Sequence, residues 1–271
     1  MTGLTGKIAV ITGGTQGLGA AIARNFAEAG AEGLVLCGRN ADNGTKVAQE
    51  IEAATGVPAL FQPADLADVD QSRAVIAAAD TRFGRVDILV NAAGLTQRGN
   101  LLDTTPELFD RMFAVNVRGP FFLMQEAAKV MIREGIEGAM VNIGSISETA
   151  GQPFISPYVA SKGALASLTR NSAFALMRNR IRVNQLDIGW MASDNEKALQ
   201  AAERGDENWL DEVARHMPFG RLIDPVEVAR VVTFLASDDS GMMTGAVVPF
   251  DQSVTGGFAA SPPVPNAPLA L

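Results

Sequence analysis

The stretch "KIAVITGGTQGLG" (Lys7–Gly19) carries in turn the signals of a strand, a turn and a helix. Its β-branched half, "KIAVIT", predicts a buried strand, and the apolar period that follows predicts a helix over Gly17–Ala29. Gly13 and Gly17 can form a tight turn that lets the main chain approach a pyrophosphate, and Gly19 allows the helix to pack closely on the strand. The stretch therefore predicts a dinucleotide-binding turn, although its G-x3-G-x-G spacing differs from the common G-x-G-x-x-G.

The same alternation of apolar runs and helical segments continues along the chain. Further strands are predicted at Gly33–Cys37, Pro58–Gln62, Val86–Asn91, Ala139–Ile143, Ile181–Leu186 and Ala246–Phe250. Further helices are predicted up to about Ala54, near Asp68–Phe83, and at Pro106–Asn116, Gly119–Arg133, Pro157–Met177 and Pro225–Ala236. Near-continuous apolar strands separated by helices indicate a parallel sheet covered on both faces. With right-handed crossovers, this predicts a single-domain α/β fold, a Rossmann-type doubly wound parallel sheet.

Domain organisation follows from the absence of any internal linker. We predict one dinucleotide-binding domain over residues 1–258, with a helical flap over the site at about residues 189–219, where the alternation is interrupted. Residues 259–271 form a Pro/Ala-rich C-terminal tail, which is either a frayed end or an arm on a neighbouring subunit.

Composition excludes several classes of function. A hydrophobic fraction of 47% supports a large core, and a net charge of −8 argues against nucleic acid or an anionic membrane as the main partner. The single cysteine, Cys37, excludes an intrachain disulfide framework, and with the single histidine, His216, it leaves no zinc-type cluster, so no metal site is predicted. The chain has no signal-peptide pattern and no apolar run near the ~20 residues that span a bilayer. We therefore expect a soluble, cytoplasmic protein.

The end of the second predicted strand bears on the choice of cofactor. NAD-binding folds usually place an acid there, on the ribose hydroxyls, but this chain has Gly38 and Arg39. A guanidinium can pair with a 2′-phosphate, so Arg39 favours NADP, with NAD as the alternative. The other interpretation is a solvated charge at a strand end, and Gln16 in the glycine turn adds no second positive charge.

Tyr158 is the only tyrosine, and Lys162 follows it by one helical turn. Ser156 and Pro157 predict an N-cap and a first-turn proline, which places Tyr158 at a helix N-terminus. The helix dipole and the Lys162 ammonium on the same face would both favour the phenolate form of Tyr158. Alone, such a pair is more typical of a tyrosine packed on a lysine stem; together with the glycine turn and Ser145, it predicts an acid–base group.

Several motifs occur in a fixed order. They are "TGGTQGLG", "ADL" with Asp65, "NAAG" (Asn91–Gly94), "VNVRG" with Asn116, "VNIGS" ending at Ser145, and "YVASK" (Tyr158–Lys162). In this order they resemble the short-chain dehydrogenase/reductase family, and the resemblance covers Leu4 to about Phe250. It implies an NAD(P)-dependent oxidoreductase.

By this resemblance, the catalytic residues are Asn116, Ser145, Tyr158 and Lys162. Ser145 would bind the substrate oxygen, Lys162 would hold the nicotinamide ribose, and Asn116 would anchor a proton-relay water. Ser147 is an alternative hydroxyl, but the spacing to Tyr158 favours Ser145. The implied cofactor-binding residues are Gly13, Gly17, Leu18, Gly19, Arg39, Asp65, Leu66, Asn91, Gly94, Tyr158, Lys162, Gly189 and Ser193, with Asp65 at the adenine ring.

The chain departs from the family pattern at three places. The usual Pro-Gly after the sixth strand is Ile188-Gly189, and the usual threonine that contacts the carboxamide is Ser193. Near the end, an Asp-Gly-Gly pattern appears as Asp251-Gln252-Ser253. These departures bear on the details of the site rather than on the activity.

The leading prediction is an NADP-dependent oxidoreductase that interconverts a carbonyl and a secondary alcohol. Polar residues expected around the substrate favour a sugar, polyol or keto compound; the expected wall residues are Thr96, Gln97, Arg98, Glu148, Gln152, Trp190 and Met191. An NAD-dependent dehydrogenase of similar substrates and a non-catalytic NADP-binding sensor or scaffold remain alternatives. His216 is expected on the surface or in the substrate wall. The family's pairing of long helices between subunits implies a homotetramer, with a dimer as the alternative.

Overall fold

Seven strands form one parallel sheet in the computed structural model, which describes residues 3–192 and 209–254. The strands are β1 (Ile8–Thr12), β2 (Gly33–Gly38), β3 (Ala59–Pro63), β4 (Ile88–Asn91), β5 (Ala139–Ser145), β6 (Arg182–Ile188) and β7 (Val247–Phe250), in the order β3-β2-β1-β4-β5-β6-β7. The order reverses between β1 and β4, and a doubly wound sheet opens a ligand crevice at that point, outside the carboxyl ends of its strands. Ser193, the C-terminal tail and part of the predicted flap lie outside the described residues.

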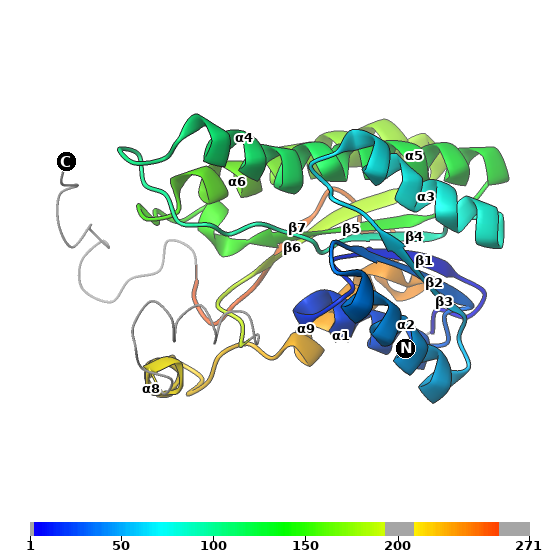
Figure 1. Ribbon diagram of the computed structural model, residues 1–271, viewed down its shortest axis with the longest axis horizontal. Coiled ribbons are helices and arrows are strands. Elements are labelled where there is room, and N and C mark those ends of the chain that lie inside the picture. The colour runs from blue at the N-terminus through cyan, green and yellow to red at the C-terminus, as the bar shows by residue number, and fades with distance from the viewer. Residues whose placement is uncertain (1–2, 193–208, 255–271) are drawn as a thin grey trace.

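Helices cover both faces of the sheet (Figure 1). One face carries α3 (Val69–Phe83), α4 (Pro106–Phe113), α5 (Gly119–Glu134) and α6 (Ser156–Leu176), and the other carries α1 (Gly17–Glu28), α2 (Ala41–Thr55) and α9 (Pro225–Ala236). A short helix, α8 (Trp209–His216), lies outside both layers. The predicted doubly wound α/β fold is thus confirmed.

The core is divided by the sheet. Along β1, Val10 packs with the buried side chains of the α3/α5 face, whereas its neighbours Ala9 and Ile11 pack with Ile22 and Phe26 of α1. Successive strand residues point to opposite faces, so a strand buried on both sides must be apolar throughout. This is why the "IAVI" run is unbroken.

Two local features differ from the predicted helices. The helices expected at Pro106–Asn116 and from Gly119 are joined by a π-helical turn over Ala114–Arg118, because α4 runs into α5 without an intervening loop. The predicted N-cap at Ser156 is wrong: α6 begins at Ser156, Ile155 takes the cap position, and the Ser156 hydroxyl donates to the Pro153 carbonyl (3.2 Å). The physical reason is that the Ser156 N–H donates to the carbonyl of Gly99 (2.8 Å), which fixes where the helix starts.

None of the helices within the described residues is long and apolar enough to cross a membrane. Across residues 3–192 and 209–254, no group of His, Cys, Asp and Glu is arranged to hold a metal ion. Cys37 is buried, and this burial raises the pKa of its thiol to about 12. The thiol therefore packs as a small apolar group on the second strand.

Candidate active site

The glycine turn joins β1 to α1 in a conformation that only glycine adopts easily. Gly13 and Gly17 have positive φ angles of 69° and 51°. A Cβ atom on Gly13 would lie 3.0 Å from the Ala93 Cα, and one on Gly19 would collide with the main chain of Gly13. The N-cap residue of α1, Gln16, makes no side-chain capping bond. The first N–H groups of the helix are thus available to a phosphate, and the residues present fit a dinucleotide.

A cleft of about 440 Å³ opens at this turn and follows the carboxyl ends of the central strands. Its walls contain most of the predicted cofactor-binding residues. Those in the lining are Gly13, Gly17, Leu18, Gly19, Arg39, Asp65, Leu66, Gly94, Tyr158, Lys162 and Gly189. Asn91 lies behind the lining, where its side-chain amide donates to Asn142 of β5 (2.8 Å).

Asp65 is held in the cleft by a residue that the sequence pattern did not single out. The Arg111 guanidinium donates to both carboxylate oxygens of Asp65, at 3.0 and 2.8 Å. Burial alone would raise the pKa of Asp65, but the Ala67 N–H and the Arg111 guanidinium outweigh it and hold the pKa below its usual value. Asp65 is therefore a fixed anion at this end of the cleft. Arg111 comes from α4, 46 residues away, so only the fold reveals the pair.

Tyr158 and Lys162 project from the first turns of α6 into the cleft. The Lys162 Nζ lies 5.6 Å from the centre of the Tyr158 ring and donates to the Ile143 carbonyl of β5 at 2.7 Å. Lys162 is only 4% exposed. Burial lowers the pKa of its ammonium to about 8, while the negative charge of Asp187 opposes this shift.

Ser145 ends β5 at the edge of the cleft. Its hydroxyl is within hydrogen-bond distance of the Ser147 hydroxyl (2.5 Å) and accepts the Ser147 N–H (3.3 Å). Ser145 lines both the cofactor cleft and a neighbouring cavity, whereas Ser147 lines only that cavity. Of the two serines, Ser145 is thus the one that reaches the cleft with the glycine turn.

Asn116 lies in the π-helical turn and is fully buried. Its side chain donates to the Leu95 carbonyl (2.9 Å) and to the Ser161 hydroxyl (3.0 Å), and accepts the Leu95 N–H (2.8 Å). A Cβ atom on Gly94 would sit 3.8 Å from the Asn116 Oδ1 and 3.7 Å from the Lys162 Nζ. Asn116 therefore ties the loop after β4 to α6 beside the lysine.

The neighbouring cavity has a volume of about 920 Å³. It shares Thr96, Ser145, Tyr158, Ile188, Gly189 and Trp190 with the cofactor cleft. Its other walls combine polar and aromatic side chains, including Gln97, Arg98, Asn100, Gln152, Phe154 and Trp209. The Trp190 and Trp209 rings lie 5.9 Å apart, and Arg98 stacks over Phe154 at 5.0 Å.

Two residues expected in the substrate wall lie elsewhere. Met191 lines the cofactor cleft, and Glu148 turns away from both cavities toward Gln185. His216, expected on the surface or in the substrate wall, is an exposed residue at the end of α8.

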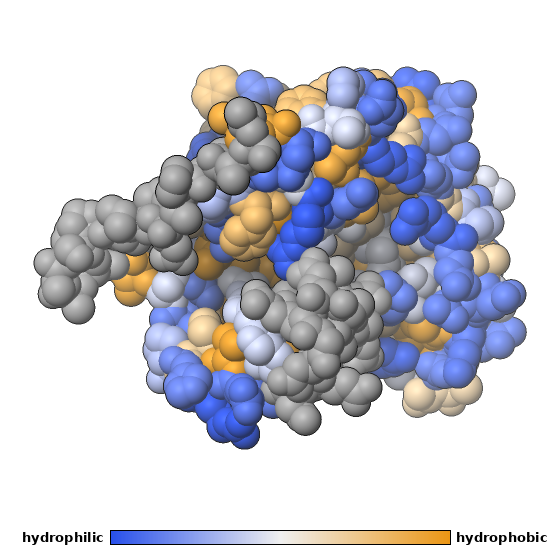
Figure 2. Space-filling view, turned by 60° about the vertical axis from the view of Figure 1, so that its left-hand side comes forward, coloured by the Kyte–Doolittle hydropathy of each residue, from blue (hydrophilic) through white to orange (hydrophobic). Residues whose placement is uncertain are grey.

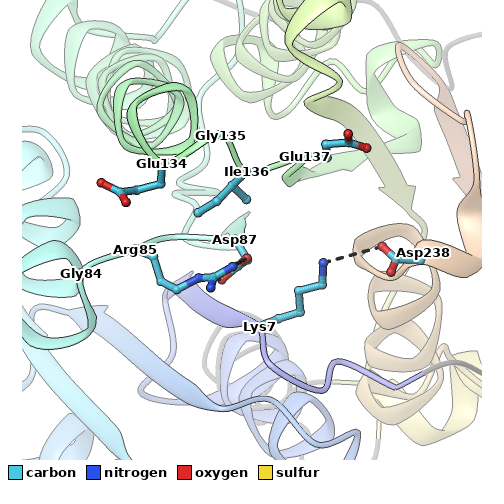
Figure 3. Close-up of a pocket in the computed structure, with 9 residues that line it drawn as sticks. All are labelled: Lys7, Gly84, Arg85, Asp87, Glu134, Gly135, Ile136, Glu137 and Asp238. Atoms are coloured by element: carbon cyan, nitrogen blue, oxygen red, sulfur yellow. Dashed lines mark hydrogen bonds and ion pairs between the residues drawn. The ribbon is translucent and has the colours of Figure 1, made fainter.

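Another cavity, of about 520 Å³, opens at the opposite edge of the sheet (Figure 3). There Asp87 accepts bonds from Arg85 (2.6 and 2.9 Å) and from the Ile8 N–H (2.9 Å), and Lys7 faces Asp238 at 3.8 Å. These charges pair with one another and hold the amino ends of the strands together. The cavity lies far from the crevice that a doubly wound sheet uses, so we assign it a structural role.

Comparison with known proteins agrees with this geometry. The family model described as Enoyl-(Acyl carrier protein) reductase matches residues 13–255. The chain is 36% identical to L-rhamnose 1-dehydrogenase (NAD(P)(+)) of Azotobacter vinelandii over 90% of this chain and 94% of that protein. It is 32% identical to galactitol 2-dehydrogenase of Agrobacterium fabrum over 88% of this chain and 93% of that protein.

A solved structure of a reductase is also similar to this chain over nearly its whole length. The L-sorbose reductase of Gluconobacter frateurii, complexed with NADPH and L-sorbose, superposes with a TM-score of 0.88 at 28% identity. The match covers 95% of this chain and 99% of that one.

Proposed function

The chain belongs to the short-chain dehydrogenase/reductase family of NAD(P)-dependent oxidoreductases acting on CH–OH groups, and we propose that it uses NADP with a sugar, polyol or keto compound as substrate. One observation carries the proposed hydride-transfer chemistry. Ser145 and Tyr158 stand on the boundary shared by the cofactor cleft and the larger cavity, where a substrate oxygen and a nicotinamide would meet.

The chemistry follows from the side chains at that boundary. NADP(H) bound in the cleft would supply or accept the hydride. Tyr158 would give its hydroxyl proton to the carbonyl oxygen during reduction and take the alcohol proton during oxidation. Ser145 would hold the same oxygen by a hydrogen bond. The Lys162 ammonium would favour the phenolate form of Tyr158, because a nearby positive charge stabilises a negative one.

Asn116 would support the site structurally rather than touch the reacting atoms. Because its side chain is saturated by Leu95 and Ser161, it would fix the position of Lys162 and the loop above it. The π-helical turn around it alters the usual main-chain hydrogen bonding, as is frequent at functional sites, so the proposed relay water would bind the main chain here rather than the saturated side chain.

The choice of NADP rests on Arg39. This residue lines the cleft just beyond β2, at the position where NAD-specific folds place an acid. Its guanidinium would pair with the 2′-phosphate. The relatives support either cofactor, since one is named for NAD(P)(+) and another was solved with NADPH.

The substrate class rests on the walls of the larger cavity. Gln97 and Gln152 offer hydrogen bonds to hydroxyl groups, and the paired indoles of Trp190 and Trp209 offer flat apolar surfaces. Figure 2 turns this end of the molecule forward and shows hydrophilic and hydrophobic residues intermingled over the described surface. Relatives named for rhamnose, galactitol and sorbose support a hydroxylated substrate.

The proposed assembly is a homotetramer, with a dimer as the alternative. Apolar side chains stand exposed on the helices of the α5/α6 layer, among them Phe121 (43%), Phe174 (78%) and Met177 (53%). Contact with a second copy would bury them. The acidic net charge of −8 suits the proposed cytoplasmic location.

A substrate screen tests this function. Sugars, polyols and ketones would be assayed separately with NAD and NADP by following the absorbance of the reduced nicotinamide. We expect turnover of hydroxylated substrates with NADP preferred. Good activity only on bulky apolar ketones would overturn the substrate class. Tight NADPH binding without turnover of any compound would instead favour the sensor or scaffold.

A further inference from the structure

Two carboxyl groups meet behind the catalytic lysine. Asp187 of β6 is 4% exposed, and Glu148, at the end of the short 3₁₀ turn Ile146–Glu148 after β5, is half-buried. Each is within hydrogen-bonding reach of the other. The Gln185 amide donates to Asp187 Oδ1 at 2.7 Å and reaches Glu148 Oε2 at 3.5 Å. Neither acid lines the cofactor cleft or the larger cavity, so neither is placed to touch cofactor or substrate.

The neighbouring strand leaves room for the Asp187 carboxylate at one glycine. Gly144 of β5 lies opposite Asp187 in the strand register, and a Cβ atom on Gly144 would collide with Asp187 Oδ1 and with Gln185 Nε2. The carboxylate therefore occupies space that any other residue at position 144 would take. On the far side, the Thr169 hydroxyl of α6 lies 3.2 Å from Gln185 Oε1, and the amide nitrogen of Gln185 faces the two acids.

The pair is coupled electrostatically to Lys162. Lys162 binds the Ile143 carbonyl, one residue before Gly144, and Asp187 acts on its ammonium as an opposite charge. Among the described residues, Arg170 of α6 is a further charged group that acts on Glu148. Burial, then the charge of Asp187, raises the pKa of Glu148 to about 7, and burial also raises that of Asp187. Two acids in contact share a proton below about neutral pH, and the pair then carries one negative charge.

We propose that Asp187 is a positioning residue for the reaction: its negative charge keeps buried Lys162 in the ammonium form, while Glu148 shares one proton with it. The proposal rests on the proposed function, in which Tyr158 needs that ammonium beside it. Without the charge of Asp187, the desolvated lysine would lose its proton at a lower pH. The two acids have opposite effects, since an ionised Glu148 competes with Asp187 for the negative charge.

The first test measures Lys162 directly and needs no activity. The chain has five lysines, so a protein labelled with ¹³C at the lysine ε-carbons gives few signals, and Lys162→Met identifies the one of interest. In Asp187→Asn, which keeps the shape, the pKa of Lys162 should fall by about one pH unit or more. In Glu148→Gln it should stay constant or rise. An unchanged value in Asp187→Asn, or an equal fall in both variants, would overturn the proposal.

The second test asks whether the charge matters to turnover. For alcohol oxidation, kcat/KM of Asp187→Asn should fall off earlier at alkaline pH, because the ammonium is lost sooner. Its rise from acid pH should not be delayed, because Lys162 is an ammonium there in both proteins. The profile narrows from the alkaline side, whereas a merely structural defect would lower it evenly. An evenly lowered or unchanged profile would overturn the role of Asp187 in the reaction.

Controls separate this proposal from the function on which it rests. Thermal unfolding checks that each variant is folded, and Asp187→Ser serves the same purpose should Asp187→Asn fail to fold. A wild-type protein inactive on all substrates would contradict the proposed function. In that case the lysine titration alone decides whether Asp187 sets the charge of Lys162.

Discussion

At the scale of single residues, the buried charge of Lys162 lowers the free energy of unfolding of the protein. Its ammonium is buried, and the pKa falls from 10.5 to about 8 because burial disfavours the charge. Between these two values the unfolded chain binds more protons than the folded one, so this group makes stability rise with pH from about 8 to 10.5. Below pH 8 the lysine is charged in both states, and the whole destabilisation from burying its charge is present.

Lys162→Met should therefore raise the melting temperature at neutral pH while abolishing turnover. The methionine has similar length and no charge to desolvate. Thermal unfolding monitored at pH 7 and again near pH 10 checks this, and the stabilisation should shrink at the higher pH. A variant that is less stable than the wild type at neutral pH would contradict this account of the buried charge.

Arg39→Ala should weaken NADPH binding by about tenfold or more and leave NADH binding nearly unchanged, because only NADPH carries the 2′-phosphate. Fluorescence titration with the two cofactors measures both affinities. Arg24→Ala, an exposed arginine paired with Glu50, is a matched control and should change neither. Equal losses for both cofactors would show that Arg39 does not read the phosphate.

Some residues of the site were predictable from the sequence and others were not. Local spacing and flanking residues were enough to predict Tyr158, Lys162 and Ser145 as site residues. The structure places all three in the lining of one cleft. Arg111 and Asp187 were not predicted, because each acts on a residue of another segment: Arg111 on Asp65, and Asp187 on Lys162. Their roles depend on how α4 and β6 pack, which no local pattern encodes.

At the scale of elements, the turn between β1 and α1 gives a sharp prediction. Gly19→Ala should greatly weaken or abolish cofactor binding, because its Cβ would collide with the main chain of Gly13 and displace the turn. Gly163→Ala is the control: it lies inside α6, and its Cβ would meet no atom within 4 Å. Calorimetric titration of NADPH compares them. Wild-type affinity in Gly19→Ala would contradict the role given to this turn.

Element boundaries were predicted to within a few residues, and the misses have identifiable causes. Helix α9 matches its prediction at both ends, and the capping box that Asp224 and Glu227 form around Pro225 fixes its start. The π-helical turn was missed, since one extra residue per turn barely changes the apolar period. The start of α6 was misplaced because it is set by a bond to distant Gly99, not by a local cap.

At the scale of the whole molecule, the exposed apolar side chains of the α5/α6 layer predict the assembly. Light scattering should give a tetramer, and Phe174→Asp should dissociate it, because a charge would be buried in the contact. Phe174→Leu should leave the assembly intact. A monomeric wild-type protein, or a Phe174→Asp variant that still assembles, would contradict this interface.

The sheet and its two helical layers were predictable because buried parallel strands must be apolar along their whole length. The substrate was not predictable, because the walls of the larger cavity come from loops and helices that lie far apart in the sequence and meet only in the folded chain. Thr96, Gln152 and Trp190 lie far apart in the sequence and come together around Tyr158.

The most direct test of the central claim is the turnover of Tyr158→Phe on a substrate that the wild-type protein converts, with NADPH affinity measured on the same sample. Removing one hydroxyl leaves the ring and the cleft in place, so cofactor affinity should be unchanged. Turnover should fall by ~10²–10⁴, the usual contribution of a general acid–base group. Turnover close to that of the wild type would contradict the assignment of Tyr158 as the acid–base residue.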